Sequence, residues 1–360
     1  MDLAVLNNML KDIKIKNKII GMDRDVFLSA EVGVTANGSV QTAKKLIDGA
    51  IYAGLDAIKF QIIGPEQIHS DRSMTYTYKI ASGEEKTENL IEMLKKYEFM
   101  MEEWRQIKDY ADQKGIIMFA TTDHPRGIDM MEAMDLPAYK ICSWDLNYYP
   151  FIRRVAKIGK PVILDAGTTD VEGLAKIVNI FKEENNNQII FLHCHHAKDA
   201  SEINLRSIQF IRDSLGVLTG LSSGDRNFDV DFAAMAFEPV MIEKRLTLDK
   251  NHPTHHHAIS LEPEEMKDYI KKIRQIQESI GRYGIYPSKN DLEGRELYWR
   301  RIVANCDIKK GNKLTKDNIE CKRPKTGGLD PIYYEIILGR TAKKDLKENQ
   351  PITWDVIFED

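Results

Sequence analysis

Eight short apolar runs alternate with longer amphipathic segments between residue 26 and about residue 282, and this alternation constrains the fold more than any other feature. The runs have the length of strands and are rich in β-branched residues: Val26–Val32, Ala57–Ile63, Ile116–Thr121, Ala138–Cys142, Val162–Ala166, Ile189–Cys194, Val217–Leu221 and Val240–Leu246. Segments of helical periodicity lie between them, for example Ala43–Ala53, Ile91–Gln113, Val171–Glu184 and Ile203–Leu215. Such alternation is typical of a parallel sheet with crossover helices. Eight runs predict a closed (β/α)₈ TIM barrel, since no GxGxxG motif follows the first run to favour an open doubly wound sheet.

The pattern changes near residue 285. The charged segment Glu264–Tyr283 is expected to form the last helix of the barrel, and the stretch 284–288, which contains glycine and proline, then interrupts the periodicity. Beyond it the apolar segments are short and separated by glycine and proline. The sequence therefore predicts three parts, a barrel domain over 1–284, a linker over 285–296 and a small module over 297–360.

Composition excludes several classes of protein. Apolar residues make up 42% of the chain and charged residues 29%, which argues against a disordered or fibrous protein. No run approaches the roughly 18 apolar residues of a membrane span, and the first residues do not resemble a signal peptide. A formal net charge of −4 without a basic stripe argues against nucleic-acid binding. Four cysteines without a CxxC pair fit a reduced, cytoplasmic protein.

Functional groups of a (β/α)₈ barrel lie at the carboxyl ends of its strands. This rule selects the following candidates: Glu31, Lys59, Gln61, Thr121, Lys140, Ser143, Asp165, His193, His195, Ser222 and Arg245. Lys59 and Lys140 each lie inside an apolar run, where a charged side chain is rare unless it is paired or functional. Two inward lysines predict an electropositive pocket for a phosphate or a carboxylate. The alternative is a pair of structural lysines in salt bridges.

Seven of the nine histidines lie between residues 193 and 257. His193 and His195 are two residues apart on a predicted strand and therefore share one face. With His196 and Asp165 they are candidate ligands for a divalent metal ion. His255–His257 form a second cluster, for which a solvated loop is the alternative. A GxSxG match at Gly220–Gly224 lacks the context of an α/β-hydrolase and is set aside.

Taken in order, these stretches resemble the N-acetylneuraminate (sialic acid) synthase family over nearly the whole chain. The matching stretches are Ala30–Gly33, Lys59–Gln61, Tyr139–Ser143, Gly159–Leu164, Leu192–Cys194, Val217–Ser222, Ile242–Lys244 and Ser260–Pro263, followed by Ile302–Ala304, Lys322–Pro324 and Leu338–Gly339. The resemblance implies a TIM barrel followed by a small antifreeze-like (SAF) domain, arranged as a domain-swapped homodimer. It also implies condensation of phosphoenolpyruvate with an N-acylated amino sugar, in which a divalent metal polarises the sugar aldehyde.

The resemblance assigns roles to individual residues. Those implied to hold phosphoenolpyruvate are Lys59, Lys140, Ser143 and Ser222. Those implied to face the sugar are Glu31, Gln61 and Thr121, with Arg323 reaching it from the partner's SAF domain. Asp145 stands where the family has an acidic residue near the reacting centre.

Five positions depart from the family's pattern. Two of them, Thr35 and Ala36, follow the first strand where the family has an asparagine and a histidine. Gly224 and Arg245 stand where the family has its metal-binding histidines, and Asp165 stands where it has a serine that contacts the phosphate. The chain therefore resembles a divergent member that lacks the family's metal ligands. Arg245, paired with Asp165, is a candidate to supply the missing positive charge, which predicts a sugar-acid synthase that works without a metal.

Two other functions stay open at this point. One is a barrel lyase, aldolase or elimination enzyme that acts on a phosphorylated or carboxylated sugar, with Lys140 or Lys59 as a Schiff-base nucleophile. The other is a non-catalytic homologue that binds sugars.

Overall fold

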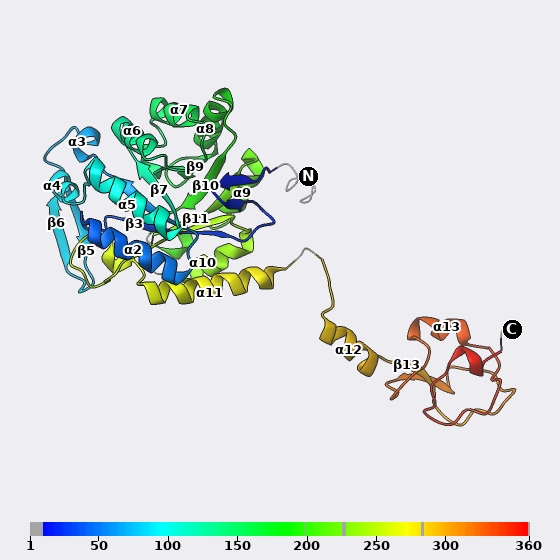
Figure 1. Ribbon diagram of the computed structural model, residues 1–360. Coiled ribbons are helices and arrows are strands. Elements are labelled where there is room, and N and C mark those ends of the chain that lie inside the picture. The colour runs from blue at the N-terminus through cyan, green and yellow to red at the C-terminus, as the bar shows by residue number, and fades with distance from the viewer. Residues whose placement is uncertain (1–9, 198, 225–227, 282–283, 359–360) are drawn as a thin grey trace. The chain divides into compact units, whose positions relative to one another are not determined.

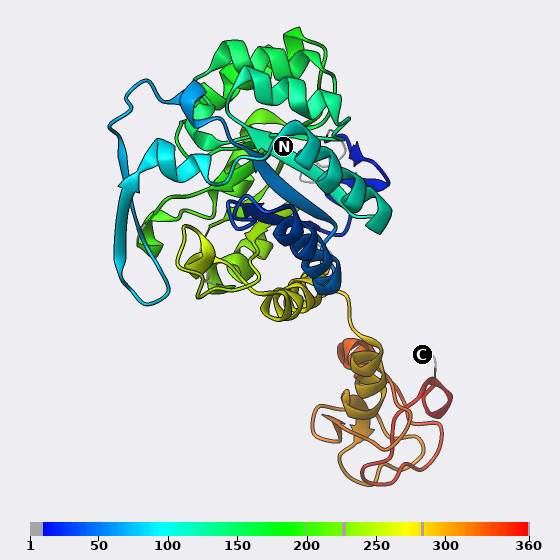
Figure 2. The ribbon, with the colours of Figure 1, turned by 60° about the vertical axis from the view of Figure 1, so that its left-hand side comes forward.

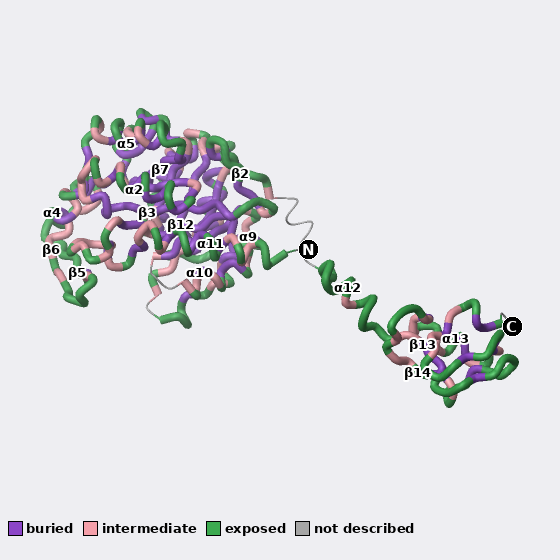
Figure 3. The backbone as a smooth tube through the Cα atoms, turned by 60° about the horizontal axis from the view of Figure 1, so that its bottom comes forward, coloured by how far each residue is buried: buried purple, intermediate pink, exposed green. Residues whose placement is uncertain are grey.

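The computed structural model describes residues 10–197, 199–224, 228–281 and 284–358. The chain divides into two compact units, Met1–Gly281 and Arg282–Asp360. Each unit has its own hydrophobic core, and buried residues concentrate in the strands at the centre of the first unit (Figure 3).

Eight parallel strands of the first unit form a closed barrel (Figure 1). Its strands are β3 (Phe27–Gly33), β4 (Ala57–Ile62), β7 (Ile117–Thr122), β8 (Tyr139–Ile141), β9 (Val162–Asp165), β10 (Ile189–Cys194), β11 (Leu218–Ser223) and β12 (Met241–Arg245). They follow one another around the barrel in chain order, and β12 pairs with β3 to close it. Each predicted run overlaps one strand, so the predicted (β/α)₈ fold is confirmed.

Helices connect the barrel strands, and most of them pack against the outside of the barrel (Figure 1). They are α2 (Val40–Ala53), α3 (Pro65–Ile68), α4 (Leu90–Lys95), α5 (Met101–Lys114), α6 (Pro125–Ala133), α7 (Tyr149–Lys157), α8 (Val171–Glu183), α9 (Ser207–Leu215), α10 (Phe228–Ala234) and α11 (Pro263–Ile280). Local signals set their ends. For example, the Ser39 hydroxyl accepts a hydrogen bond from the Thr42 N–H at the start of α2, and Gly54 ends that helix with φ 89°.

The single helix predicted over Ile91–Gln113 is wrong. The structure has two helices there, α4 and α5, separated by the segment 96–100. Tyr97 and Phe99 in this segment are buried, and Phe99 packs edge-on against Trp104 with ring centroids 4.9 Å apart. Burial of these two aromatic rings interrupts the helix, although the helical spacing of apolar residues continues across the break.

Two hairpins of the first unit were not predicted. Strands β1 (Ile13–Ile15) and β2 (Lys18–Ile20) pack their buried isoleucines against the apolar residues at the amino-terminal ends of the barrel strands. Strands β5 (Thr75–Lys79) and β6 (Glu85–Asn89) form a longer hairpin that projects at the side of the barrel (Figure 2). The first hairpin closes the amino-terminal end of the barrel with apolar side chains, so the polar interior lies toward the carboxyl end.

The second unit is small and has short elements. It contains α12 (Lys289–Tyr298), the antiparallel strands β13 (Arg301–Ala304) and β14 (Ile319–Lys322), and α13 (Tyr334–Ile337). Helix α12 covers most of the segment that the sequence marks as a linker, and Ser288 caps its start. No helix in the described parts of either unit is both long and apolar enough to cross a membrane.

We expect a chain that ends at residue 284 to fold as an independent barrel. The hydrophobic clusters of the barrel draw all their buried members from the first unit, so truncation removes none of that core. Thermal unfolding followed by circular dichroism should show one cooperative transition for the truncated chain. A truncated chain without such a transition would show that the barrel needs the second unit.

Candidate active site

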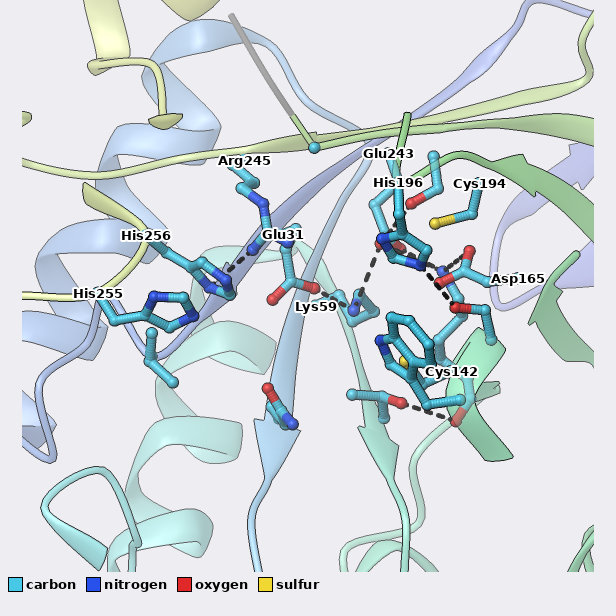
Figure 4. A pocket seen from close by; sticks show the side chains of 18 of the residues that line it. Glu31, Lys59, Cys142, Asp165, Cys194, His196, Glu243, Arg245, His255 and His256 are labelled. Atoms are coloured by element: carbon cyan, nitrogen blue, oxygen red, sulfur yellow. Dashed lines mark hydrogen bonds and ion pairs between the residues drawn. The ribbon is translucent and has the colours of Figure 1, made fainter. Parts of the chain in front are cut away.

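A cavity of about 430 Å³ opens at the carboxyl ends of the barrel strands (Figure 4). Most residues that the sequence selected line it: Glu31, Lys59, Gln61, Thr121, Lys140, Ser143, Asp165, His195, His196, Ser222 and Arg245. The structure thus brings together side chains from strands that are far apart in the sequence. The cavity is the place where the predicted substrate-binding groups meet.

A chain of alternating carboxylates and ammonium groups crosses the floor of this cavity. Glu31 forms an ion pair with Lys59, whose Nζ lies 3.4 Å from Oε1 of Glu243. The Nζ of Lys140 lies 3.1 Å from Oε2 of Glu243 and 2.9 Å from Oδ1 of Asp165. All five residues are buried. Each ammonium group therefore lies between two carboxylates (Figure 4).

The register of the barrel strands explains this arrangement. Arg245 on β12 pairs with Glu31 on β3, which in turn pairs with Lys59 on β4. Because side chains alternate along a strand, residues two apart point to the same side, and paired residues of parallel neighbours point together. Glu243 lies two residues before Arg245 on β12, so it also points into the barrel, one layer nearer the amino-terminal ends of the strands. Its carboxylate reaches Lys140 of β8 across the interior.

Glu243, which pairs with both lysines, is a candidate site residue that the strand-end rule does not select. It was quoted only within the matching stretch Ile242–Lys244, because the rule applied to strand ends selected Arg245. The signal that would have found it is the period of two, since Glu243 precedes Arg245 by two residues and shares its face. Its 4% exposure shows how completely this carboxylate is withdrawn from water.

The pKa values within this chain of charges shift in different directions. Burial alone would lower the pKa of Lys59 and Lys140, but the adjoining carboxylates outweigh burial and raise both. Burial would raise the pKa of Glu243, but the two lysines outweigh it and lower this pKa. For Asp165, burial prevails over the Lys140 charge and raises the pKa. The raised pKa makes Asp165 easier to protonate than an ordinary aspartate.

This result corrects the expected electropositive pocket. The lysines are not free cations, since Glu31, Glu243 and Asp165 already surround them. When Asp165 is ionised, the negative charges of these three carboxylates equal the positive charges of Lys59, Lys140 and Arg245. Protonation of Asp165 would leave these groups with an excess of one positive charge.

The residues at the family's metal position do not fit a metal ion. Gly224 has no side chain, and the guanidinium of Arg245 lies beside it, with Nε 3.7 Å from where a Cβ of Gly224 would stand. Arginine stays protonated and offers no lone pair to a cation. Among the residues that the structure describes, no group of three or more His, Cys, Asp or Glu side chains is placed to hold a metal ion. We therefore assign no step of the reaction to a metal.

The rings of His193 and His195 are neighbours, with centroids 6.2 Å apart, but among the described residues the predicted ligands do not gather into a group of three that could hold a metal ion, which corrects that prediction. On β10 the alternation of side chains directs Cys194 into the cavity and His193 to the helix side, where its Nε2 donates a hydrogen bond of 2.7 Å to the Ile203 carbonyl. The Nε2 of His196 lies 3.1 Å from the Ser143 hydroxyl, and its ring stacks on Trp144. His193 and His196 thus have structural partners of their own.

Two other predicted residues lie outside the lining of the cavity. Asp145, in the short 3₁₀ segment Ser143–Asp145, is half-buried, and burial raises its pKa to about 6. Arg323 belongs to the second unit, where its Nε donates a hydrogen bond of 2.7 Å to the Tyr298 carbonyl. A role for Arg323 in a partner's cavity stays a prediction.

One wall of the cavity is apolar and was not predicted. It is lined by Val34, Tyr76, Leu90, Met93 and Leu94. Tyr76 belongs to the hairpin β5–β6, and the other four follow β3 or lie in α4. The cavity therefore combines an ionic floor with a wall that suits an apolar substituent.

Comparison with known proteins identifies the family. Residues 46–284 match the NeuB family, and residues 300–357 match the SAF domain. The chain belongs to the NeuB family. This confirms the resemblance seen in the sequence, and the SAF match confirms the predicted nature of the small module. The described barrel strands β4 to β12 lie within the NeuB match.

Similar proteins cover almost the whole chain. The uncharacterized protein MJ1065 of Methanocaldococcus jannaschii is 33% identical, over 98% of this chain and 100% of its own length. The pseudaminic acid synthase of Campylobacter jejuni is 32% identical, over 90% of this chain and 94% of its own. The crystal structure of the sialic acid synthetase of Leptospira borgpetersenii, in complex with citrate, has a TM-score of 0.71 at 26% identity and covers 79% of this chain and 95% of its own.

The variant Glu243→Gln tests the chain of charges in this NeuB-family barrel. Removing one partner of a buried ion pair typically lowers the free energy of unfolding by about 3–5 kcal/mol, because the remaining charges stay buried without compensation. Glu183→Gln is the matched control, since Glu183 pairs with Arg153 at the surface, where the loss should be under about 1 kcal/mol. Urea unfolding of both variants measures the difference. Equal effects would show that Glu243 does not hold the interior together.

Proposed function

We propose that this chain is a sugar-acid synthase that condenses phosphoenolpyruvate with the aldehyde form of an N-acylated amino sugar. The reaction joins C3 of phosphoenolpyruvate to the aldehyde carbon, consumes one water and releases inorganic phosphate. The observation that carries the proposal is the buried array of Lys59, Glu243 and Lys140 on the floor of the cavity. The names of the relatives, a pseudaminic acid synthase and a sialic acid synthetase, support the same class of reaction.

The floor supplies what a small dianion requires. Lys59 and Lys140 keep their charge because the carboxylates around them raise their pKa. The hydroxyls of Ser143 and Ser222 line the same cavity, where they contact His196 Nε2 at 3.1 Å and Glu243 Oε1 at 3.5 Å, and a bound anion would have to compete for them. Asp165, once protonated, adds a donor in place of a negative charge, which is the form compatible with a bound phosphate.

The opposite side of the cavity suits an acylated amino sugar. An N-acyl group has an apolar end and an amide that needs hydrogen bonds. Residues of the apolar wall, such as Leu90 and Met93, would contact the apolar end of the N-acyl group. The side-chain amide of Gln61 would form a hydrogen bond with its amide. Thr121 is less available, since its hydroxyl donates to the Lys140 carbonyl at 3.1 Å.

Arg245 is proposed to polarise the sugar aldehyde. Its Nε is buried and has no hydrogen-bond partner among the described residues, so this N–H is available to a substrate oxygen. A fixed cation next to a developing negative charge stabilises the transition state without rearrangement of solvent. On this proposal the condensation needs no metal ion.

The lyase and aldolase alternatives are less well supported. A Schiff base requires a neutral lysine, and such enzymes lower the lysine pKa for that purpose. Here the pKa values of Lys59 and Lys140 are raised instead. A non-catalytic role would not explain the five buried charged groups, since burying each of them costs desolvation free energy.

We also propose the domain-swapped homodimer that the resemblance implies. In this assembly Arg323 of each SAF domain would contact the sugar in the partner's barrel. The barrel truncated after residue 284 would then still bind phosphoenolpyruvate but fail to turn over the sugar.

A phosphate-release assay tests the reaction. We expect the protein to release phosphate only when phosphoenolpyruvate and an N-acylated amino sugar are both present, and to do so in excess chelator. Arg245→Ala should lower kcat by on the order of 10²-fold, as the loss of one preorganised donor does, and Arg245→Lys should retain part of the rate.

Two outcomes would contradict this proposal in different ways. Release that chelator abolishes and added metal restores would refute the role of Arg245 in place of a metal. No release with any sugar of a broad panel would refute the synthase function itself.

The affinity for phosphoenolpyruvate should depend on the protonation of Asp165. Because its pKa is raised, Asp165 is neutral at low pH and ionises as the pH rises through that pKa, which then opposes the bound anion. Affinity of the unmodified protein should therefore fall with rising pH relative to Asp165→Asn, which stays neutral. Calorimetric titrations between pH 5 and about pH 9 would measure both, and the ligand's own ionisation cancels in the comparison. Parallel pH profiles would rule out this role of Asp165.

A further inference from the structure

His256 forms a hydrogen bond with the guanidinium of Arg245. Its Nδ1 lies 2.8 Å from Nη1 of Arg245, and both residues line the cavity (Figure 4). Arginine can only donate in this contact, so Nδ1 of His256 accepts and the ring proton is on Nε2. Burial, followed by the charge of Arg245, keeps the pKa of His256 well below its ordinary value, so the ring remains a neutral acceptor.

The backbone of His256 is in an unusual conformation. Its φ is 72° and ψ is −18°, in the left-handed region that residues other than glycine, asparagine and aspartate seldom adopt. Neighbouring contacts hold it there, since the Ser260 hydroxyl donates to the His256 carbonyl at 2.8 Å. Glycine or asparagine would make this turn with less strain. A histidine at this position adds an acceptor and an aromatic ring, and strained residues of this kind cluster at functional sites.

The ring of His256 is also fixed from its other side. It lies against the ring of His255, with centroids 3.5 Å apart. His255 in turn packs edge-on against Tyr76 and Tyr78, with centroids 4.9 and 5.2 Å apart. The hairpin β5–β6 thereby restrains the imidazole that binds Arg245.

With Nη1 engaged by His256, the other edge of the guanidinium is left for a ligand. Nε and Nη2 lie 3.7 and 3.9 Å from where a Cβ of Gly224 would stand, so the absent side chain leaves space along this edge. The buried Nε has no hydrogen-bond partner in the described parts of the chain. Two parallel N–H groups form a fork that matches an oxygen acceptor.

We propose that His256 is a positioning residue that holds Arg245 with its Nε and Nη2 edge over Gly224, where this edge receives the aldehyde oxygen of the sugar. The inference rests on the proposed synthase function and extends it, because it assigns to His256 a role in orienting Arg245 that does not involve metal binding. It also predicts that His256 acts on the reaction only through Arg245.

Two substitutions separate the hydrogen bond from the backbone turn. His256→Gly adopts the left-handed conformation freely but removes the acceptor. His256→Asn tolerates the same conformation and places its Oδ1 near the position of Nδ1. We expect His256→Gly to lower kcat by on the order of 10²-fold with the KM for phosphoenolpyruvate unchanged, and His256→Asn to recover most of that loss. Full-length protein and the phosphate-release assay would be used for all variants.

A double-mutant cycle tests whether His256 acts through Arg245. If it does, the double variant Arg245→Ala with His256→Gly should be no slower than Arg245→Ala alone. Additive losses would overturn the proposal, as would a His256→Gly variant with normal kcat or a His256→Asn variant as slow as the glycine variant. If the role of His256 were purely structural, both variants would be less stable, without the recovery of kcat by asparagine and without the non-additive effect of the double variant.

A crystal structure of His256→Gly gives a readout that does not depend on turnover. We expect the guanidinium to leave its position beside Gly224, and an unmoved guanidinium would overturn the inference. If the unmodified protein releases no phosphate with any sugar, the proposed function fails, while this structure still decides whether His256 positions Arg245.

Discussion

One carboxylate shared by two buried ammonium groups is the interaction on which the interior of this barrel depends. Removing a charged group from water costs several kcal/mol, and none of these groups would be stable in the barrel alone. Glu243 compensates Lys59 and Lys140 at once, while Glu31 and Asp165 complete the two ends. The apolar lower half of the barrel and the hairpin β1–β2 keep water from reaching this layer from below.

The same arrangement sets the chemistry that the cavity can perform. On the proposed function, the balanced charges of the floor receive an anion when one carboxylate is neutralised, and Asp165 is a group of this floor whose pKa is raised. At the rim, a guanidinium held by His256 occupies the region next to Gly224. Within this NeuB-family barrel a lysine floor thus lies below a guanidinium, the combination on which the proposed electrostatic polarisation of the aldehyde rests.

Much of this organisation was predictable because its signals are local. The spacing of apolar runs predicted all eight strands, and the strand-end rule selected Lys59, Lys140 and Arg245. The prediction missed the break between α4 and α5, where burial of Tyr97 and Phe99 overrides a continuous helical period. It also missed Glu243, because a glutamate inside an apolar run does not reveal its partners.

The sequence by itself determined which residues lie in strands and, through the period of two, which of them share a face. Only the tertiary structure decided which face is the interior, and so directed Cys194 into the cavity and His193 away from it. It also decided the pairing of charges, since Lys140 and Glu243 are 103 residues apart in the chain. The reason is physical: alternation along a strand is a property of the local backbone, whereas an ion pair across a barrel requires its closure and the register of all its strands.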